Sequence, residues 1–276
     1  DGTLLSSDHM ISEQNRQAIL DAQAKGHIVL ICSGRSPASI NEVLQHAELS
    51  CPVAASNGTV MYTQTDILRS ISIEKKDVSR IINELEREQL PFEIYTQNGV
   101  FIPSNWSDRI HTIIDSGRIP AEYAAHDLYE FTVKNPKEFQ TGISVCQDPQ
   151  AFCQREDVHV QKFYVSTLIP QQKERLRETL HAIKGVGVTS SAQFNVEVMA
   201  ADGHKGSGIR YMAQHFGIPM ENTVAIGDNF NDVPMFKAAG FAIAMGNAEP
   251  DVKVICDEVT KSNDEDGVAH ALNHLI

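Results

Sequence analysis

Helical and strand-like hydrophobic patterns alternate along the first part of the chain. A helical spacing of apolar residues begins after Ser12 and continues to about Lys25, where Gly26 is a typical stop signal. The run Ile28-Val29-Leu30-Ile31-Cys32 that follows is apolar without a break, which is typical of a short strand buried on both faces. Three more segments are predicted in this region: a helix that starts near Pro37, and strands over 52–55 and 59–62.

Two Asn-Gly pairs predict β-hairpins. Asn57-Gly58 separates the strands predicted over 52–55 and 59–62, and Asn98-Gly99 separates apolar runs over 92–95 and 100–102. Asn-Gly is a strong signal for a two-residue hairpin turn, because both residues accept positive φ angles. The sequence therefore predicts one hairpin in the first region and another in the middle of the chain.

The middle of the chain, residues 76–188, mixes hairpins with helices. Its further predicted elements are helices over 76–89, 106–116 and 171–183 and a strand over 158–168. Residues 119–140 carry no pattern that favours either kind of element. Such a mixture is typical of an α+β domain built on an antiparallel sheet.

The last region returns to alternating helices and strands. Its predicted elements are helices over 205–216, 232–239 and 265–275 and strands over 223–226 and 241–244. Together with the first region they predict an α/β fold with a Rossmann-like parallel-sheet core, formed by residues 1–75 and 189–276. Residues 76–188 are then an inserted α+β domain.

Composition narrows the function classes. The 276 residues carry a net charge of −13 and no block of Lys and Arg, so we expect no nucleic-acid partner. No apolar run approaches the roughly 18 residues that span a bilayer, so we expect no membrane contact. The five cysteines include no Cys-x-x-Cys pair, which favours reduced thiols in a cytoplasmic protein over disulfides or zinc. Composition leaves the oligomeric state open.

The segment Gly227-Asp228-Asn229-Phe230-Asn231-Asp232 is the sharpest chemical motif in the sequence. It follows a predicted buried strand, and loops at the carboxyl ends of parallel strands form the ligand crevice of such sheets. Its two carboxylates and two amides are suitable oxygen ligands for Mg²⁺. The alternative is that the Asn and Asp side chains cap the following helix, and the segment alone favours neither interpretation.

Three further loops place polar residues at strand ends or helix starts. Ser33-Gly34-Arg35 follows a predicted strand and offers a hydroxyl and backbone amides to an anion, or is a plain turn. Lys205 begins a predicted helix, where a positive charge is unfavourable without a nearby anion, or it is an exposed Lys of a Gly-rich loop. Asp1-Gly2-Thr3 is a functional loop or a common Asp-Gly turn.

These four segments, in this order, resemble the haloacid dehalogenase-like phosphohydrolase superfamily. Segments 240–248 and 263–269 look like the Cof-type branch, whose cap lies between the second and third motifs. The resemblance implies that residues 76–188 are this cap. It also implies a Mg²⁺-dependent phosphatase of small phosphorylated metabolites, such as sugar phosphates or phosphorylated cofactors.

The resemblance further implies a role for each motif residue. Asp1 is the expected general acid/base, and its backbone carbonyl is an expected metal contact. Lys205 is expected to neutralise charge on the phosphoryl group during catalysis. The remaining expected roles are phosphate binding by Gly2, Ser33, Gly34, Lys205 and Asn231, and metal binding by Asp228 and, through water or through the groups around the metal, by Asp232.

The sequence begins at the second Asp of the first motif. The resemblance places the nucleophile two positions before Asp1, on a strand central to the sheet, and we expect both in the protein. That Asp is expected to form an aspartyl-phosphate, which water then hydrolyses. Two alternatives stay open: a non-catalytic phosphate-ligand sensor on the same scaffold, and a phosphomutase.

Other residues receive ordinary structural roles. His270 and His274 have the i, i+4 spacing of a zinc pair but no evident third ligand, so we expect surface or packing positions. Arg35 is left with two possible partners, a substrate anion or a carboxylate. Core positions are expected for four aromatic residues: Phe92, Tyr95, Phe101 and Trp106.

Overall fold

The computed structural model describes residues 1–126, 129–138, 140 and 142–275. The chain divides into two compact units: Asp1–Ser70 with His204–Ile276, called the core unit here, and Ile71–Gly203, called the inserted unit. The domain boundaries predicted at 75/76 and 188/189 therefore need correction. The second is too early because strands β9 (Val186–Thr189) and β10 (Asn195–Ala200) pair within the sheet of the inserted unit.

The core unit contains two sheets with parallel strands. The first has the order β1-β2-β3-β4, in which β1 and β2 are parallel and the other pairs antiparallel. The second has the order β11-β12-β13 and is parallel. The bounds are β1 Ile31–Cys32, β2 Val53–Ala55, β3 Val60–Tyr62, β4 Ile67–Ser70, β11 Val224–Gly227, β12 Phe241–Ala244 and β13 Glu258–Val259. No ladder joins β1 to β11 within the described ranges, and a central strand before Asp1 stays a prediction.

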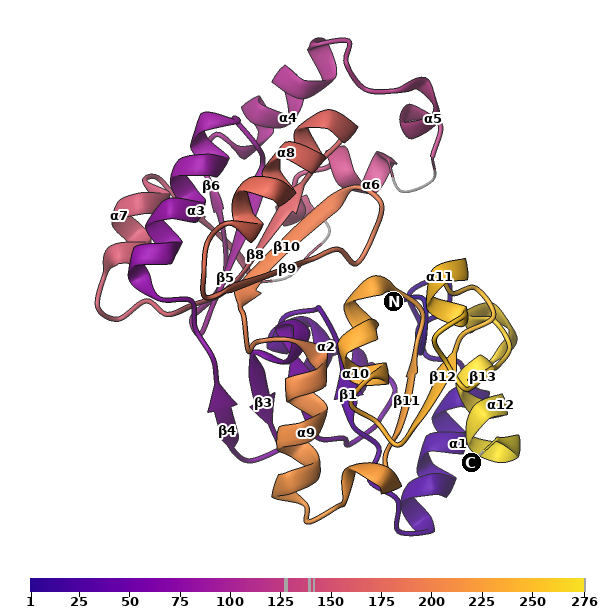
Figure 1. Ribbon diagram of the computed structural model, residues 1–276. Coiled ribbons are helices and arrows are strands. Elements are labelled where there is room, and N and C mark those ends of the chain that lie inside the picture. Colours follow the sequence, from indigo (N-terminus) through magenta and orange to yellow (C-terminus); the bar gives the residue numbers. More distant parts are fainter. Residues whose placement is uncertain (127–128, 139, 141, 276) are drawn as a thin grey trace. The chain divides into compact units, whose positions relative to one another are not determined.

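Helices accompany both sheets. The first, α1, starts after Ser12, whose hydroxyl accepts from the backbone N–H of Asn15 at 3.1 Å, so the predicted cap is confirmed. The first and last helices, α1 and α12, lie side by side although they come from opposite ends of the sequence (Figure 1). The bounds are α1 Glu13–Ala24, α2 Pro37–His46, α9 Lys205–His215, α10 Val233–Phe236, α11 Pro250–Lys253 and α12 Gly267–His274, with short 3₁₀ turns η1 Ser56–Gly58, η3 Met220–Asn222, η4 Phe230–Asp232 and η5 Asn263–Glu265.

Each sheet of the core unit has its own apolar cluster. One includes Ala225 of β11 and Phe236 of α10. The other includes Val53 of β2 and Ile40 of α2. Leu4 packs against both clusters, so apolar contacts to both sheets anchor the loop that carries the first three residues.

The inserted unit is an α+β domain, as the sequence predicts. Its sheet has the order β7-β6-β5-β8-β10-β9, in which β6 and β7 are parallel and the other pairs antiparallel. One face of this sheet packs against α3, α4 and α8 through a cluster that includes Phe92, Phe163 and Trp106 (Figure 1). The bounds are β5 Phe92–Thr96, β6 Gly99–Pro103, β7 Ile143–Cys146, β8 Val160–Ser166, α3 Lys75–Arg87, α4 Trp106–Asp115, α5 Ala121–Ala124, α6 Tyr129–Val133, α7 Pro149–Gln154, α8 Pro170–His181 and η2 Pro136–Glu138.

The opposite face of this sheet carries a buried charged cluster. Because side chains alternate along a strand, Glu93, Lys162 and Glu197 lie on the face away from Phe92. The Lys162 Nζ is 2.8 Å from Glu197 Oε1 and 4.3 Å from the centre of the Tyr95 ring. All three charged side chains are buried.

Three predicted elements are shorter or more broken than their hydrophobic pattern indicates. The strand predicted over 28–32 is reduced to Ile31–Cys32. The helix predicted over 232–239 is the turn η4 followed by α10, and the helix predicted over 265–275 is divided at Asp266, which has φ 57. Both interrupted helices follow capping boxes, which close a 3₁₀ turn before the helix begins.

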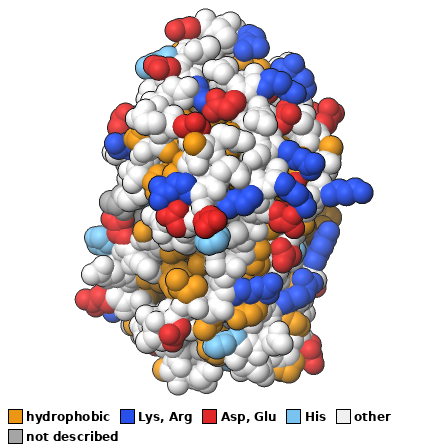
Figure 2. Space-filling model, turned by 90° about the vertical axis from the view of Figure 1, so that its left-hand side faces the viewer, with side chains coloured by type: hydrophobic (Ala, Val, Ile, Leu, Met, Phe, Trp, Pro, Cys, Tyr) orange, Lys and Arg blue, Asp and Glu red, His pale blue; other side chains and the backbone are white. Residues whose placement is uncertain are grey.

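The compositional expectations concern helices, cysteines and surface charge. Among the described residues no helix is long and apolar enough to cross a bilayer. All five cysteines are free thiols. Figure 2 shows acidic side chains interspersed with basic ones on one face of the molecule. The expected lack of a nucleic-acid partner stays a prediction.

Candidate active site

The candidate site residues lie on loops that follow strands of the core unit. The loop of Asp228 to Asp232 follows β11, and Ser33 follows β1 directly. Lys205 is the first residue of α9. A capping box fixes the start of that helix, in which the His204 N–H donates to the Ser207 hydroxyl and the Ser207 N–H to His204 Nδ1, and it thereby sets the position of Lys205.

Lys205 is buried against Asp232. Its Nζ lies 2.5 Å from Asp232 Oδ1, and both side chains are less than one-tenth exposed. Burial alone would lower the pKa of Lys205, but Asp232, Cys32 and Asp228 raise it, and the net pKa is raised. The ammonium therefore stays charged, and an exposed Lys in a Gly-rich loop is the wrong interpretation. The anion expected beside this helix start is supplied by Asp232.

Asp232 also orders the loop after β11. Its Oδ2 accepts hydrogen bonds from the backbone N–H groups of Asp228 at 2.9 Å and of Asn229 at 3.0 Å. The Asn229 side chain accepts from the backbone N–H of Phe230 at 2.8 Å. The capping interpretation of this segment therefore applies to Asn229 and Asp232, whereas the Asp228 side chain contacts the first loop of the chain.

Asp228 contacts Thr3 and Gly2. The Thr3 hydroxyl donates to Asp228 Oδ1 at 2.5 Å. Gly2 has φ 73, and a Cβ there would collide with the Asp228 carboxylate, so glycine is required by both backbone and space. Burial and then Asp232 raise the pKa of Asp228, against the opposing effects of Thr3 and Lys205. Burial and the neighbouring Asp232 therefore disfavour the ionised form of the Asp228 carboxylate, and a cation beside it would stabilise that form.

Asp1 is paired with Arg35. The Arg35 Nε and Nη2 atoms donate to the two carboxylate oxygens at 2.7 and 2.5 Å. The His9 Nδ1 atom lies 3.1 Å from Asp1 Oδ1. Of the two partners left open for Arg35, the structure shows the carboxylate. The Asp1 side chain is still about half-exposed, so solvent reaches it.

Ser33 and Asn231 are connected through Asn57. The Asn57 N–H donates to the Ser33 carbonyl at 2.9 Å, and Asn231 Nδ2 donates to Asn57 Oδ1 at 3.2 Å. The Ser33 hydroxyl accepts from the Arg35 N–H at 3.2 Å, with Gly34 between them. Residues 33–35 therefore form a turn, which was one of the two interpretations of this segment. The Ser33 hydroxyl still has its own O–H to donate.

Lys205 also lies next to the strand that leads to Ser33. The Cys32 Sγ is 3.9 Å from the Lys205 carbonyl oxygen. Desolvation raises the pKa of the Cys32 thiol to about 12, with Lys205 opposing, so this half-buried thiol stays protonated and unreactive. The structure thus brings the first loop, Ser33, Lys205 and Asp228 into one region of the core unit.

The predicted metal contacts are the Asp1 backbone carbonyl and the Asp228 and Asp232 carboxylates, and the acidic side chains here do not form a single cluster. Within the described part of the chain, no group of three or more His, Cys, Asp or Glu side chains is arranged to hold a metal ion. The Asp1 carboxylate pairs with Arg35 and that of Asp232 with Lys205, whereas the Asp228 carboxylate accepts from the Thr3 hydroxyl. This arrangement still fits Mg²⁺, which is often held by one or two carboxylates together with water and substrate phosphate.

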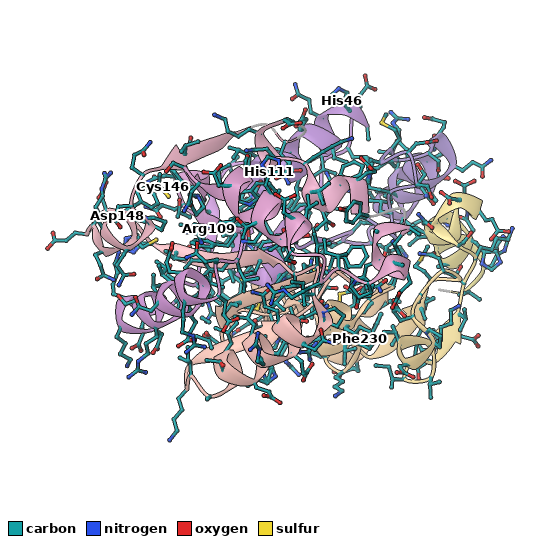
Figure 3. The ribbon with its side chains drawn as sticks, turned by 90° about the horizontal axis from the view of Figure 1, so that it is seen from above. His46, Arg109, His111, Cys146, Asp148 and Phe230 are labelled. Atoms are coloured by element: carbon teal, nitrogen blue, oxygen red, sulfur yellow. The ribbon has the colours of Figure 1, made fainter. Side chains whose placement is uncertain are left out.

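Sequence reasoning missed some contributors to this region. Asn57 is predicted from the sequence only as a hairpin residue. Asn247 Nδ2 donates to the Gly2 carbonyl at 2.7 Å, and its place in the 240–248 segment is the signal that could have found it. Phe230, labelled in Figure 3, is 46% exposed in the middle of the Asp228–Asp232 loop.

A sequence profile of the haloacid dehalogenase-like hydrolases matches residues 1–272. The chain belongs to this family. The resemblance, fold class and enzyme class expected from the sequence are therefore confirmed, and the protein is a hydrolase. The individual roles of its site residues stay predictions.

Relatives and solved structures resemble this hydrolase over its whole length. Phosphatase YwpJ of Bacillus subtilis is 31% identical over 100% of this chain and 97% of its own. The 5-amino-6-(5-phospho-D-ribitylamino)uracil phosphatase YwtE of the same organism is also 31% identical, over 100% and 96%. A solved haloacid dehalogenase-like hydrolase from B. subtilis has a TM-score of 0.87 at 28% identity, covering 100% of this chain and 97% of its own. The subclass IIB sugar phosphatase BT4131 has a TM-score of 0.78 at 25% identity, covering 100% and 96%.

Proposed function

We propose that this hydrolase is a Mg²⁺-dependent phosphatase of small phosphorylated metabolites. The observation that carries the proposal is the placement of a buried, charged Lys205 in the same region as Asp228, a carboxylate whose ionised form is disfavoured by burial and by Asp232. A phosphomonoester and a divalent cation complement this pair, because Lys205 attracts the anion and Asp228 the cation. Both curated relatives described above are named phosphatases, which supports the same reaction.

The loops of the core unit divide the work of phosphoryl transfer. Lys205, held by Asp232, neutralises charge on the equatorial oxygens of the phosphoryl group. The Ser33 hydroxyl, the Gly34 N–H and the Asn231 amide hydrogen-bond to the same oxygens. Gly2 keeps the first loop close to these groups.

Asp1 acts as the general acid and then as the general base. It protonates the oxygen of the leaving group and later removes a proton from the attacking water. Its pairing with Arg35 and His9 orients the carboxylate, and its partial exposure lets protons exchange with solvent.

Mg²⁺ would be held by the Asp228 carboxylate and the Asp1 backbone carbonyl. When bound, it shields the negative charges of nucleophile and phosphate from each other. The Thr3 hydroxyl orients the Asp228 carboxylate for this role. The Asp232 oxygens accept hydrogen bonds from Lys205 and from two backbone amides. A contact between Asp232 and the metal through water stays a prediction.

The proposal includes an aspartyl-phosphate intermediate. The family resemblance places the nucleophilic Asp two positions before Asp1, and its carboxylate would attack phosphorus and displace the leaving group. Water would then hydrolyse the acyl phosphate, with Asp1 as the base. The inserted unit is proposed as the cap that selects the leaving group.

The proposed substrates are phosphate monoesters such as sugar phosphates or phosphorylated cofactors. BT4131 is described as a sugar phosphatase and YwtE as a phosphatase of a ribitylaminouracil phosphate, which supports this substrate class. A cytoplasmic location fits such substrates and stays part of the proposal.

Phosphate release by the full-length protein tests the proposal. We expect release from at least one member of a panel of sugar phosphates, phosphorylated cofactors and p-nitrophenyl phosphate in Mg²⁺, and none in EDTA. Binding of a phosphorylated ligand without turnover of any panel member would favour the sensor. Transfer of the phosphoryl group to a second hydroxyl of the same sugar would favour the phosphomutase.

A further inference from the structure

The turn between β2 and β3 has an unusual backbone. Three consecutive residues lie in the left-handed region: Ser56 with φ 50, Asn57 with φ 61 and Gly58 with φ 85. The left-handed conformation is strained for a residue with a side chain, although Asn tolerates it better than most. Such strain is kept where the surrounding structure requires it, and it clusters at functional sites.

This turn is also buried, unlike an ordinary hairpin loop. Ser56 is 0% and Asn57 1% exposed. The Ser56 hydroxyl is buried and has no hydrogen-bond partner among the described residues. A buried, strained turn with an unsatisfied hydroxyl is not the arrangement that maximises stability, which points to a role in the site.

The turn contacts three of the segments that make up the candidate active site. Its backbone N–H groups donate to the carbonyls of Arg35 and Ser33, each at 2.9 Å. The Asn57 side chain accepts from Asn231 at 3.2 Å. Gly58 lies so close to the start of α9 that a Cβ there would be 2.7 Å from the His204 carbonyl oxygen.

We infer that Asn57 is a positioning residue for the phosphoryl group, which holds Ser33 and Asn231 in their working geometry. The inference rests on the proposed function. Its backbone fixes the loop of Ser33 and its amide oxygen fixes the donor orientation of the Asn231 amide. Because a displacement of about 1 Å at a reacting centre costs up to about 100-fold in rate, losing this contact lowers turnover more than it lowers stability.

Three variants of the full-length protein test the inference with p-nitrophenyl phosphate and Mg²⁺: Asn57→Gly, Asn231→Ala and the double variant. Asn57→Gly keeps a residue that accepts φ 61 and removes only the amide. We expect kcat to fall about 10–100-fold in Asn57→Gly, with a thermal midpoint within a few degrees of wild type. The double variant should be no slower than Asn231→Ala, because Asn57 acts through Asn231.

The control is Asn98→Gly, the same substitution in the exposed Asn-Gly turn of the inserted unit, which should leave kcat within twofold. The inference is overturned if Asn57→Gly also stays within twofold, or if its effect multiplies with that of Asn231→Ala. If the Asn57→Gly variant does not fold, the Asn57→Asp variant tests the inference instead, because the Asp side chain keeps an acceptor for the Asn231 amide. Its kcat must then stay within about fivefold of wild type with a raised KM, and a larger loss of kcat contradicts the inference.

An inactive wild-type protein would fail the proposed function itself. An active wild type with indifferent Asn57 variants would fail only the inference about Asn57. The two failures are therefore distinguishable.

Discussion

Each of the two units buries one lysine against a carboxylate. In the core unit Lys205 lies 2.5 Å from Asp232, and in the inserted unit Lys162 lies 2.8 Å from Glu197. All four side chains are less than one-tenth exposed. By burial and distance alone the two pairs look equivalent.

Their surroundings differ. Lys162 and Glu197 come from neighbouring strands β8 and β10, joined by an antiparallel ladder, and Lys162 also packs over the Tyr95 ring. Lys205 and Asp232 instead come from a helix start and a 3₁₀ turn, beside loops that follow β1 and β11. A buried ion pair by itself therefore does not identify a site. The convergence of several loops at strand ends on that pair does.

The largest expected effect separates the two lysines. Lys205→Met removes the charge next to the phosphoryl group, and we expect kcat/KM for p-nitrophenyl phosphate to fall about 10²–10³-fold. Lys162→Met should leave kcat/KM within about fivefold for this small substrate. It should lower the free energy of unfolding by about 3–5 kcal/mol, because Glu197 loses its buried partner.

The two lysine variants are compared by steady-state kinetics and by fluorescence-monitored unfolding. The single tryptophan, Trp106, is buried in the core of the inserted unit, so its emission reports the unfolding of that unit. Equal losses of activity in the two variants would show that the Lys205–Asp232 pair is no more important for catalysis than the Lys162–Glu197 pair.

The next effect concerns carboxylates. Asp228→Asn removes the charge proposed to hold the metal, so we expect kcat/KM to fall by about 10²-fold and the Mg²⁺ concentration for half-maximal activity to rise. The control is Asp157→Asn in the inserted unit, where an exposed pair with Arg155 is broken. This control should change neither kcat/KM nor the Mg²⁺ concentration for half-maximal activity. If wild type and Asp228→Asn give the same Mg²⁺ titration, Asp228 is not the metal ligand.

Glycines with positive φ angles give a smaller, matched test. Gly2→Ala forces a Cβ against the Asp228 carboxylate, whereas Gly117→Ala in the inserted unit, at φ 65, meets nothing within 4 Å. Both variants should lose about 1 kcal/mol of stability from backbone strain. Only Gly2→Ala should also lose activity, by tenfold or more, and kinetics combined with thermal melts measure both quantities.

The last effect is a pH dependence of stability, confined to the inserted unit. Burial raises the pKa of Glu93 to about 7, against opposing effects of Lys162 and Tyr95. The folded state then binds more protons than the unfolded state between pH 4.5 and 7, so this residue lowers the free energy of unfolding as pH rises through that window. In wild type this residue should lower the free energy of unfolding by about 1–3 kcal/mol between pH 5 and 8, and Glu93→Gln should remove that decrease. A Trp106-monitored denaturation series over this pH range measures it, and an unchanged slope in the variant would show that Glu93 is not its source.

Local signals in the sequence predict much of this fold. Ser12 and Gly26 mark α1, and Asn98-Gly99 marks the β5–β6 hairpin, because caps and turns depend on neighbouring residues. The boundary after β10 was missed, since the pairing of β10 with β8 depends on residues far apart in the chain. Asn57-Gly58 joins two antiparallel strands as predicted, but through the three-residue turn η1 rather than a two-residue turn.

The sequence predicts which residues belong to the candidate site, but only some of the contacts between them. The order of motifs locates Asp228 and Lys205, because family motifs are local in sequence. Side-chain partners are not local. The Lys205–Asp232 pair spans 27 positions and the Thr3–Asp228 hydrogen bond spans 225, so no pattern in the sequence shows which carboxylate Lys205 binds and which one remains for a metal.

A crystal of the full-length protein soaked with Mn²⁺ and tungstate tests the central claim most directly. The account predicts one anomalous peak for Mn²⁺ beside the Asp228 carboxylate and one for tungstate, bonded by Lys205 and Ser33. Tungstate elsewhere on the molecule, or Mn²⁺ bound without Asp228, would contradict the claim that these loops form a phosphoryl-transfer site.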